Sequence, residues 1–140
     1  MNIRLSDDPT DISWEALAVV FHRAPLGERK PEKLREAFTR SPVRCFVWDD
    51  DRLIGAGRAL TDGVTFAAVF DIVLLPEYQR KGIGSRIMEH LAAASKAPNL
   101  ILHAVPGKEA FYRKLGFRKM TTAMARFSNP EKQQEQGYIE

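Results

Sequence analysis

Residues 79–85, with the sequence QRKGIGS, place two glycines and two cations between an apolar run and a helical pattern. Because Gly82 and Gly84 have no side chain, an anion can approach the main chain there. The first turn of a helix also presents N–H groups without intrahelical partners and the positive end of the helix dipole. This segment therefore predicts a phosphate or pyrophosphate site made mainly by backbone amides, with Arg80 and Lys81 at its rim.

Two better-known phosphate-binding patterns do not fit this segment. A Walker-type loop requires a lysine directly after its last glycine, whereas Lys81 precedes Gly82. A dinucleotide-binding fingerprint requires a third glycine where Ile87 stands, and no acidic strand end follows at the usual distance. The remaining alternative is that the glycines serve only the geometry of a strand-to-helix turn.

Other side chains that could move a proton lie in apolar runs or near a helix end. Asp71 is the only carboxylate in the run 64–75, which requires either a partner or a functional role. As a structural residue, Asp71 would accept a hydrogen bond from a backbone N–H or from a cation such as Arg58. His103 lies in a second apolar run and His22 near a helix end; a lone histidine in an apolar strand is more often a core residue than a base.

Length and composition predict one soluble globular domain over residues 1–140, because 44% of the residues are hydrophobic and 28% are charged. No apolar run is long enough to span a bilayer, and the chain begins without a leader pattern, so we expect a cytoplasmic protein. The net charge of +3 comes from scattered cations, which argues against a nucleic-acid-binding protein. Cys45 lies between apolar residues and is expected to pack as a small core side chain.

The elements that would position these residues follow from hydrophobic periodicity and from turn residues. Helices are expected over 8–24, capped by Thr10 or Asp11, and over 30–41, 83–96 and 107–115. Strands are expected over 2–5, over 43–63 as two strands joined by an acidic turn at 49–51, and over 64–75, 99–105 and 117–127. Residues 129–140 form a polar tail with a composition typical of disorder. This order predicts an α/β fold (mixed α+β), with helices on both faces of a mixed sheet.

The segment Q-R-K-G-I-G resembles the Q/R-x-x-G-x-G/A signature of the GCN5-related N-acetyltransferases (GNAT), which bind the coenzyme A pyrophosphate at this turn. The segment AFYRKLGF, residues 110–117, resembles the family's second landmark, a tyrosine in a short helix before the last strands. The resemblance covers about residues 43–127 and is closest to small bacterial members related to the arylamine and serotonin N-acetyltransferase group. It implies a three-layer α/β/α fold around a strongly twisted sheet that is splayed between strands 4 and 5.

The resemblance also implies an activity and its residues. An acetyl group would move from acetyl-CoA to a primary amine of a small molecule or peptide, by direct attack in a ternary complex and without a metal. Tyr112 would act as general acid toward the departing thiolate, unless it only packs as an aromatic side chain. A strand N–H group would polarise the thioester carbonyl. The implied coenzyme-binding residues, besides Tyr112, are Ile72, Val73, Leu74, Gln79, Arg80, Lys81, Gly82, Ile83, Gly84 and Ser85.

Three questions stay open at the level of sequence. Asp71 is assigned a catalytic role beside Tyr112, but His103, His22 or a water molecule could equally serve as the base. The alternative function is a coenzyme-A-binding sensor or interaction module with little turnover, against which the retained Tyr112 argues. The amine acceptor is not specified; no nucleic-acid or membrane partner is expected, and family members often form homodimers.

Overall fold

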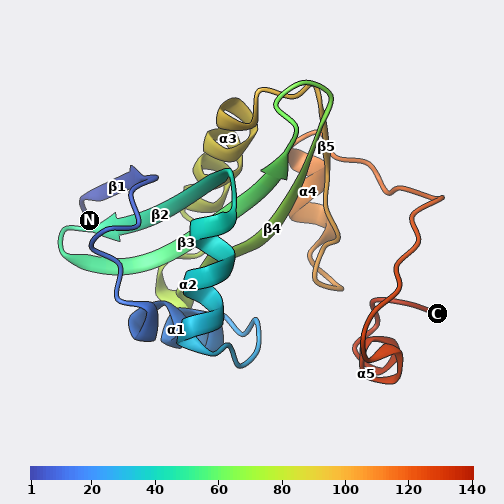
Figure 1. The fold of residues 1–140 in the computed structure, drawn as a ribbon, viewed down its shortest axis with the longest axis horizontal. Helices are drawn as coiled ribbons and strands as arrows, with labels where there is room; N and C mark the ends of the chain where they lie inside the picture. The colour runs from blue at the N-terminus through green and yellow to red at the C-terminus, as the bar shows by residue number, and fades with distance from the viewer. The chain divides into compact units, whose positions relative to one another are not determined.

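The computed structural model describes all residues, 1–140, and divides them into two compact units, Met1–Leu102 and His103–Glu140. The first unit contains a five-stranded sheet with the strand order β1-β2-β3-β4-β5 (Figure 1). Its strands are β1 (Ile3–Ser6), β2 (Val43–Asp49), β3 (Arg52–Thr61), β4 (Phe66–Leu74) and β5 (Asn99–Ile101). Its helices are α1 (Trp14–Arg23), α2 (Pro31–Arg40), the 3-10 helix η1 (Pro76–Tyr78) and α3 (Ile83–Ser95).

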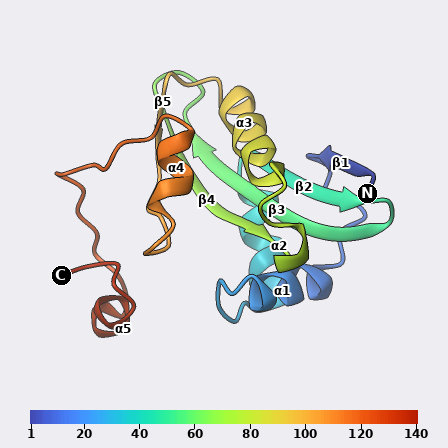
Figure 2. The same ribbon diagram turned by 180° about the vertical axis from the view of Figure 1, so that it is seen from behind.

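The sheet is mixed and is covered on both faces. The pairs β1–β2, β2–β3 and β3–β4 are antiparallel, whereas β5 pairs with β4 in parallel. Helices α1 and α2 lie on one face and α3 lies on the other, as the two opposite views show (Figures 1 and 2). The predicted fold class, with helices on both faces of a mixed sheet, is confirmed.

The starts of the first two helices are set by a capping serine and by a proline. Helix α1 is capped by Ser13, whose hydroxyl accepts a hydrogen bond from the N–H of Ala16. The prediction that Thr10 or Asp11 caps this helix is therefore wrong, because Ser13 can satisfy the same orphan N–H groups closer to the apolar stripe. Helix α2 begins at Pro31. Proline is tolerated there because an N–H group at the first helical position would have no partner within the helix.

Aromatic packing holds α1 and α2 on the sheet. The ring centroid of Phe38 on α2 lies 5.5 Å from that of Phe46 on β2 and 6.5 Å from that of Phe21 on α1. All three rings are fully buried. Trp14 extends this cluster, with its ring 6.0 Å from Phe46 in an edge contact. The face opposite is covered by the predicted α3 stripe, in which the buried residues are Ile83, Ile87, Met88 and Leu91.

The second unit contains two short helices, α4 (Glu109–Lys114) and α5 (Pro130–Glu135). Helix α4 confirms the helix predicted there, whereas the strand predicted over 117–127 is wrong, because the structure has no strand after β5. Alternation of apolar and polar residues reports only a side-chain period, and a strand also needs a ladder partner. Strand β5 is shorter than the predicted 99–105, and the polar segment 129–140 contains α5, capped by Asn129.

Candidate functional site

The predicted anion-binding turn lies between β4 and α3. Gly82 is the N-cap of α3 with φ +80°, and Arg80 also has a positive φ of 62°. The Gln79 side chain donates from Nε2 to the carbonyl oxygen of Leu74 at 2.9 Å, which ties the turn to the end of β4. The predicted residues 79–85 therefore form one continuous loop and first helical turn.

The loop fits a pyrophosphate in three respects. An ideal Cβ built on Gly82 would meet no atom within 4 Å, so the space in front of its main chain is open. No side chain caps α3, and its first turn holds no acidic residue. The N–H groups of the first helical turn, including those of Gly84 and Ser85, therefore face no competing carboxylate from their own helix.

An ion-pair network anchors the start of this turn to the rest of the sheet. Glu77 in η1 accepts from Arg23 of α1 at 2.9 Å and from Arg52 of β3 at 3.1 Å. The neighbouring Tyr78 donates its hydroxyl to Asp49 at 2.5 Å. Hydrogen bonds from its own backbone N–H and from the two guanidinium groups lower the pKa of the Glu77 carboxyl to about 2.

This network makes a testable contribution to stability. Because the pKa of Glu77 is lowered in the folded state, its stabilisation is present above pH ~4.3 and is lost as the pH falls towards 2. Glu77→Gln is expected to lower the denaturant midpoint at pH 6. The difference in midpoint between the variant and the wild type is expected to shrink as the pH falls towards 3. Glu89→Gln is the control, because it makes the same charge change at an exposed position of α3 outside the network. If the difference in midpoint between Glu77→Gln and the wild type does not depend on pH, the Glu77 ion pairs do not contribute in this way.

Strand β4 is paired on both sides over only part of its length. Its parallel partner β5 pairs with Phe66, Ala67 and Ala68 and ends there. From Val69 to Leu74, β3 is the only strand of the sheet that pairs with β4. The splay between the fourth and fifth strands that the resemblance implied is thus observed.

A β-bulge interrupts β4 at the middle of this segment. Arg58 pairs with Phe70 and Ala56 with Val73, so Gly57 alone opposes two residues of β4. Asp71, the first of these two, has φ +58°, a left-handed conformation that aspartate tolerates better than most residues. Gly57 is required on the opposite strand, since a Cβ there would lie 2.9 Å from Cγ2 of Ile87 on α3.

The three strand residues predicted to contact the coenzyme differ in orientation. The Val73 carbonyl points towards β3, because an ideal Cβ on Gly55 would lie only 2.7 Å from it. Successive residues of a strand point their backbone groups to alternate sides. Ile72 and Leu74 therefore turn their main-chain groups to the edge that β5 leaves, and they are better placed than Val73 for a ligand.

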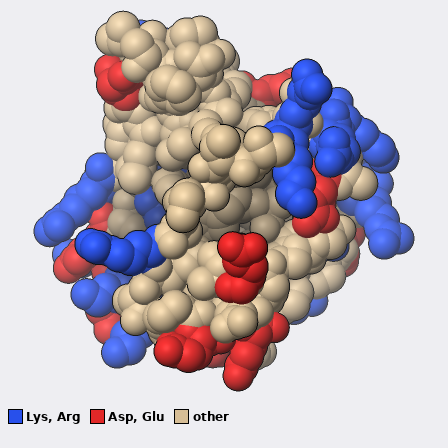
Figure 3. All heavy atoms as spheres, turned by 90° about the vertical axis from the view of Figure 1, so that its right-hand side faces the viewer, with Lys and Arg blue, Asp and Glu red and all other residues tan.

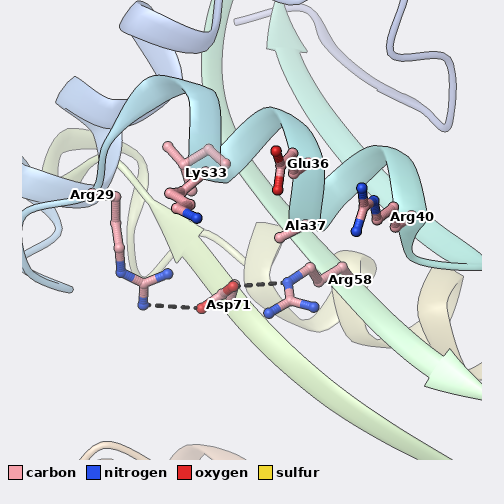
Figure 4. A pocket seen from close by; sticks show the side chains of 8 residues that line it. Arg29, Lys33, Glu36, Ala37, Arg40, Arg58 and Asp71 are labelled. Atoms are coloured by element: carbon pink, nitrogen blue, oxygen red, sulfur yellow. Dashed lines mark hydrogen bonds and ion pairs between the residues drawn. The ribbon is translucent and has the colours of Figure 1, made fainter.

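Asp71 has two guanidinium partners in the structure. Its Oδ2 accepts from Nε of Arg58 at 2.8 Å, and its Oδ1 accepts from Nη2 of Arg29 at 3.1 Å (Figure 4). The bulge places Asp71 and Phe70 on the same face, where the Arg58 guanidinium also lies 5.3 Å from the Phe70 ring centroid. The alternative prediction, that Asp71 accepts a hydrogen bond from Arg58 as a structural residue, is confirmed. The second partner, Arg29, was not predicted from the sequence.

Two of the remaining candidate groups belong to the second unit. In the second unit, Tyr112 on α4 is half-buried, with ring contacts to Phe111 and Phe117 at 5.0 and 5.9 Å. Burial raises the pKa of the Tyr112 phenol, and the charge of Tyr138 adds to the shift. His103 follows β5 and is not in a strand; its ring lies 5.6 Å from that of Tyr138.

Two further candidates lie in the first unit. His22 is exposed on the last turn of α1 and contacts Glu28. Cys45 is fully buried, and burial raises the pKa of its thiol to about 12, as expected for a core residue and not for a nucleophile.

Comparison with known families identifies the class. Residues 41–119, more than half of the chain, match the Acetyltransferase (GNAT) domain. Together with the half-paired β4 and the glycine turn before α3, this match shows that the chain belongs to the GNAT acetyltransferase family.

The curated relatives are longer than this chain. Serotonin N-acetyltransferase 2, chloroplastic, of Oryza sativa subsp. japonica is 37% identical over 125 residues, which cover 82% of this chain and 60% of that protein. GCN5-related N-acetyltransferase 1, chloroplastic, of Arabidopsis thaliana is 36% identical over 111 residues, covering 76% of this chain and 56% of that protein. The chain thus spans less than two thirds of either relative.

Solved structures support the fold. A probable acetyltransferase from meticillin-resistant Staphylococcus aureus has a TM-score of 0.78 at 24% identity and covers 91% of this chain and 98% of its own. The ribosomal-protein-S18-alanine N-acetyltransferase of Escherichia coli has a TM-score of 0.72 at 21% identity, covering 85% and 79%. At these identities the likeness concerns the fold alone.

Proposed function

We propose that this protein transfers the acetyl group of acetyl-CoA to a primary amine of a small molecule or peptide, by direct attack in a ternary complex. The observation that carries the proposal is the open main chain at Gly82, placed at the N-terminus of α3 and joined through Gln79 to the half-paired β4. A ligand with a pyrophosphate at one end and an extended amide-bearing arm at the other would use both features. Coenzyme A has this composition.

Each part of the site has a role in this proposal. The amides of residues 82–85 would hold the pyrophosphate, with Arg80 and Lys81 adding positive charge at the rim. The main-chain groups of Ile72 and the N–H of Leu74, whose carbonyl accepts from Gln79, would pair with the extended arm, as an added strand would. An N–H group at this edge would also stabilise the negative charge that develops on the carbonyl oxygen.

Acetyl-CoA, when bound, supplies a thioester whose C–S bond breaks as the amine nitrogen forms its bond to the acetyl carbon. An alkylamine has a pKa of ~10.4, so its proton must be removed at neutral pH. Tyr112 would donate the proton that the departing thiolate needs. Its phenol stays protonated at neutral pH, because burial raises its pKa further above the ordinary value.

The proton of the amine would leave through water. Both oxygens of Asp71 already accept hydrogen bonds from guanidinium groups, so we assign Asp71 to shaping the strand and the adjoining cavity. His22 is exposed beside Glu28 and would at most relay a proton to solvent. With water as the proton acceptor, no side chain of the sheet has to act as the base.

The proposal is tested by two measurements on the full chain. Calorimetric titration with acetyl-CoA is expected to show binding, and coenzyme A release is expected only when an amine is present, with a product one acetyl group heavier. The panel includes serotonin, for which the rice relative is named, because the shared family makes it a reasonable first acceptor. Absence of acetyl-CoA binding would overturn the proposal, whereas binding without release for every amine would favour the sensor.

The remaining expectations are also proposals. Figure 3 shows one face with both Lys or Arg and Asp or Glu side chains on it. That no nucleic acid is a partner stays a proposal, which rests on the scattered cations of the sequence. No helix has the length and apolar character to cross a membrane. A cytoplasmic location and a homodimer stay predictions, and the names of the rice and Arabidopsis relatives place those two proteins in the chloroplast.

A further inference from the structure

A cavity of about 340 Å³ lies between α2 and the strands β3 and β4, on the face of the sheet opposite α3. Its charged lining residues are four cations, Arg29, Lys33, Arg40 and Arg58, and two carboxylates, Glu36 and Asp71. Figure 4 shows α2 crossing above the two strands, with the cationic side chains around Asp71. The lining therefore carries an excess of two positive charges.

The least exposed part of the cavity also carries excess positive charge, by one unit. Arg29 and Arg58 share the single carboxylate of Asp71, which is 11% exposed, while their own side chains are 35% and 18% exposed. Arg29 is also held against the Phe21 ring, 4.7 Å from its centroid, and Arg58 donates to the Ser41 hydroxyl at 3.3 Å. Two fixed guanidinium groups with one counter-charge leave donors and one positive charge for a second anion.

Helix α2 adds two further cations at the rim. Lys33 and Arg40 are exposed and lie seven residues apart on the helix, so they share one side of it. Neither forms an ion pair within 4 Å, although Glu36 lies between them. Both long side chains can therefore turn to a bound anion without breaking an existing pair.

The cavity is next to the proposed reaction centre. Asp71 lies in it, and the following residue, Ile72, turns its main chain to the open edge of β4. The proposed pyrophosphate site at residues 82–85, called here the cradle, lies at the start of α3 on the other face of the sheet. A molecule in the cavity would therefore not occupy the space of the pyrophosphate. An acceptor bound here would approach β4 from the α2 face.

We propose that this cavity binds the acceptor through an anionic group, a carboxylate or a phosphate, so that the substrate is an amine that also carries a negative charge. The inference rests on the proposed acetyl transfer and names the acceptor class for it. Bidentate guanidinium groups suit either anion. The amine would then be the part of the acceptor that extends towards Ile72.

Matched acceptor pairs test the inference and separate the two anions. β-Alanine is compared with β-alaninamide, and phosphoethanolamine with ethanolamine, as substrates in coenzyme A release and as ligands in calorimetry with coenzyme-A-saturated protein. The anionic member of at least one pair is expected to have at least about tenfold higher kcat/KM and affinity, which corresponds to about 1.4 kcal/mol. The pair with the larger ratio identifies carboxylate or phosphate.

Variants of α2 assign the preference to this cavity. Lys33→Gln with Arg40→Gln is expected to reduce the preference for the anionic member severalfold while acetyl-CoA affinity stays unchanged. Arg35→Gln removes one charge from an exposed position of the same helix outside the cavity and is expected to leave the preference intact. A preference that survives the double variant would overturn the assignment.

The outcomes separate this inference from the function beneath it. Turnover of the neutral amines at equal or higher kcat/KM overturns the anionic acceptor and leaves acetyl transfer standing. If no amine is turned over, the calorimetric ratio still decides, because it does not depend on catalysis. Equal binding within each pair, or no binding by either member, overturns the inference in that case as well.

Discussion

Gly82→Asp is expected to reduce acetyl-CoA affinity at least about 100-fold while leaving a folded protein. A carboxylate at residue 82 would project into the open space before α3 and exclude an anion from the amides there. The loss of two charge-assisted hydrogen bonds, at about 1.5–3 kcal/mol each, corresponds to a change of this size. Isothermal calorimetry with acetyl-CoA measures it, and far-ultraviolet circular dichroism reports whether the fold is kept.

The chain offers a matched control for the backbone strain at this position. Gly63 has φ +74° against +80° for Gly82, and a Cβ on either would meet no atom within 4 Å. Gly63→Asp therefore introduces similar strain and the same charge in the turn after β3, far along β4 from the cradle. We expect similar destabilisation of the two variants, with acetyl-CoA affinity lost only in Gly82→Asp; an equal affinity for both would remove Gly82 from the site.

Tyr112→Phe is expected to lower kcat by about 10²–10⁴, the range for loss of a general acid, with little change in acetyl-CoA affinity. The substitution keeps the ring that packs on Phe111 and Phe117 and removes only the hydroxyl. Steady-state kinetics of coenzyme A release and calorimetry with acetyl-CoA separate the two effects. An unchanged kcat would show that Tyr112 serves packing alone.

The pH dependence gives this prediction a second readout. Since burial raises the pKa of Tyr112, the acid form is present at neutral pH and is lost only at alkaline pH. The wild-type kcat should fall at that alkaline end, and Tyr112→Phe should lose this limb. Tyr138→Phe removes a hydroxyl from the same unit and is expected to change kcat far less.

Features that depend on neighbouring residues could be predicted from the sequence. The glycine turn, the α3 stripe and the start of α2 at Pro31 follow from local backbone preferences and a 3.6-residue period. The same kind of pattern failed for 117–127, where alternation was present but no ladder formed. The N-cap of α1 was misplaced by two or three residues, because several polar residues precede that helix.

Features that depend on distant residues could not be predicted. Arg29 reaches Asp71 across 42 positions in the chain, a contact that exists only once α2 and the preceding segment lie on β4. The bulge at Asp71 also needs the register of β3 against β4, which no single strand encodes. The sequence did carry one signal for it, an aspartate in an apolar run, which tolerates a positive φ more readily than its neighbours.

The bulge in β4 also bears on attempts to stabilise this protein. Asp71 is one residue in excess of a regular ladder, so a design procedure that idealises strands would delete it or replace it with a β-branched residue. Either change would remove the shared counter-ion of Arg29 and Arg58, and deletion would also straighten β4 and realign the edge formed by Ile72 and Leu74. Thermostability and activity are therefore expected to oppose each other at this residue, and engineering for robustness belongs elsewhere in the sheet.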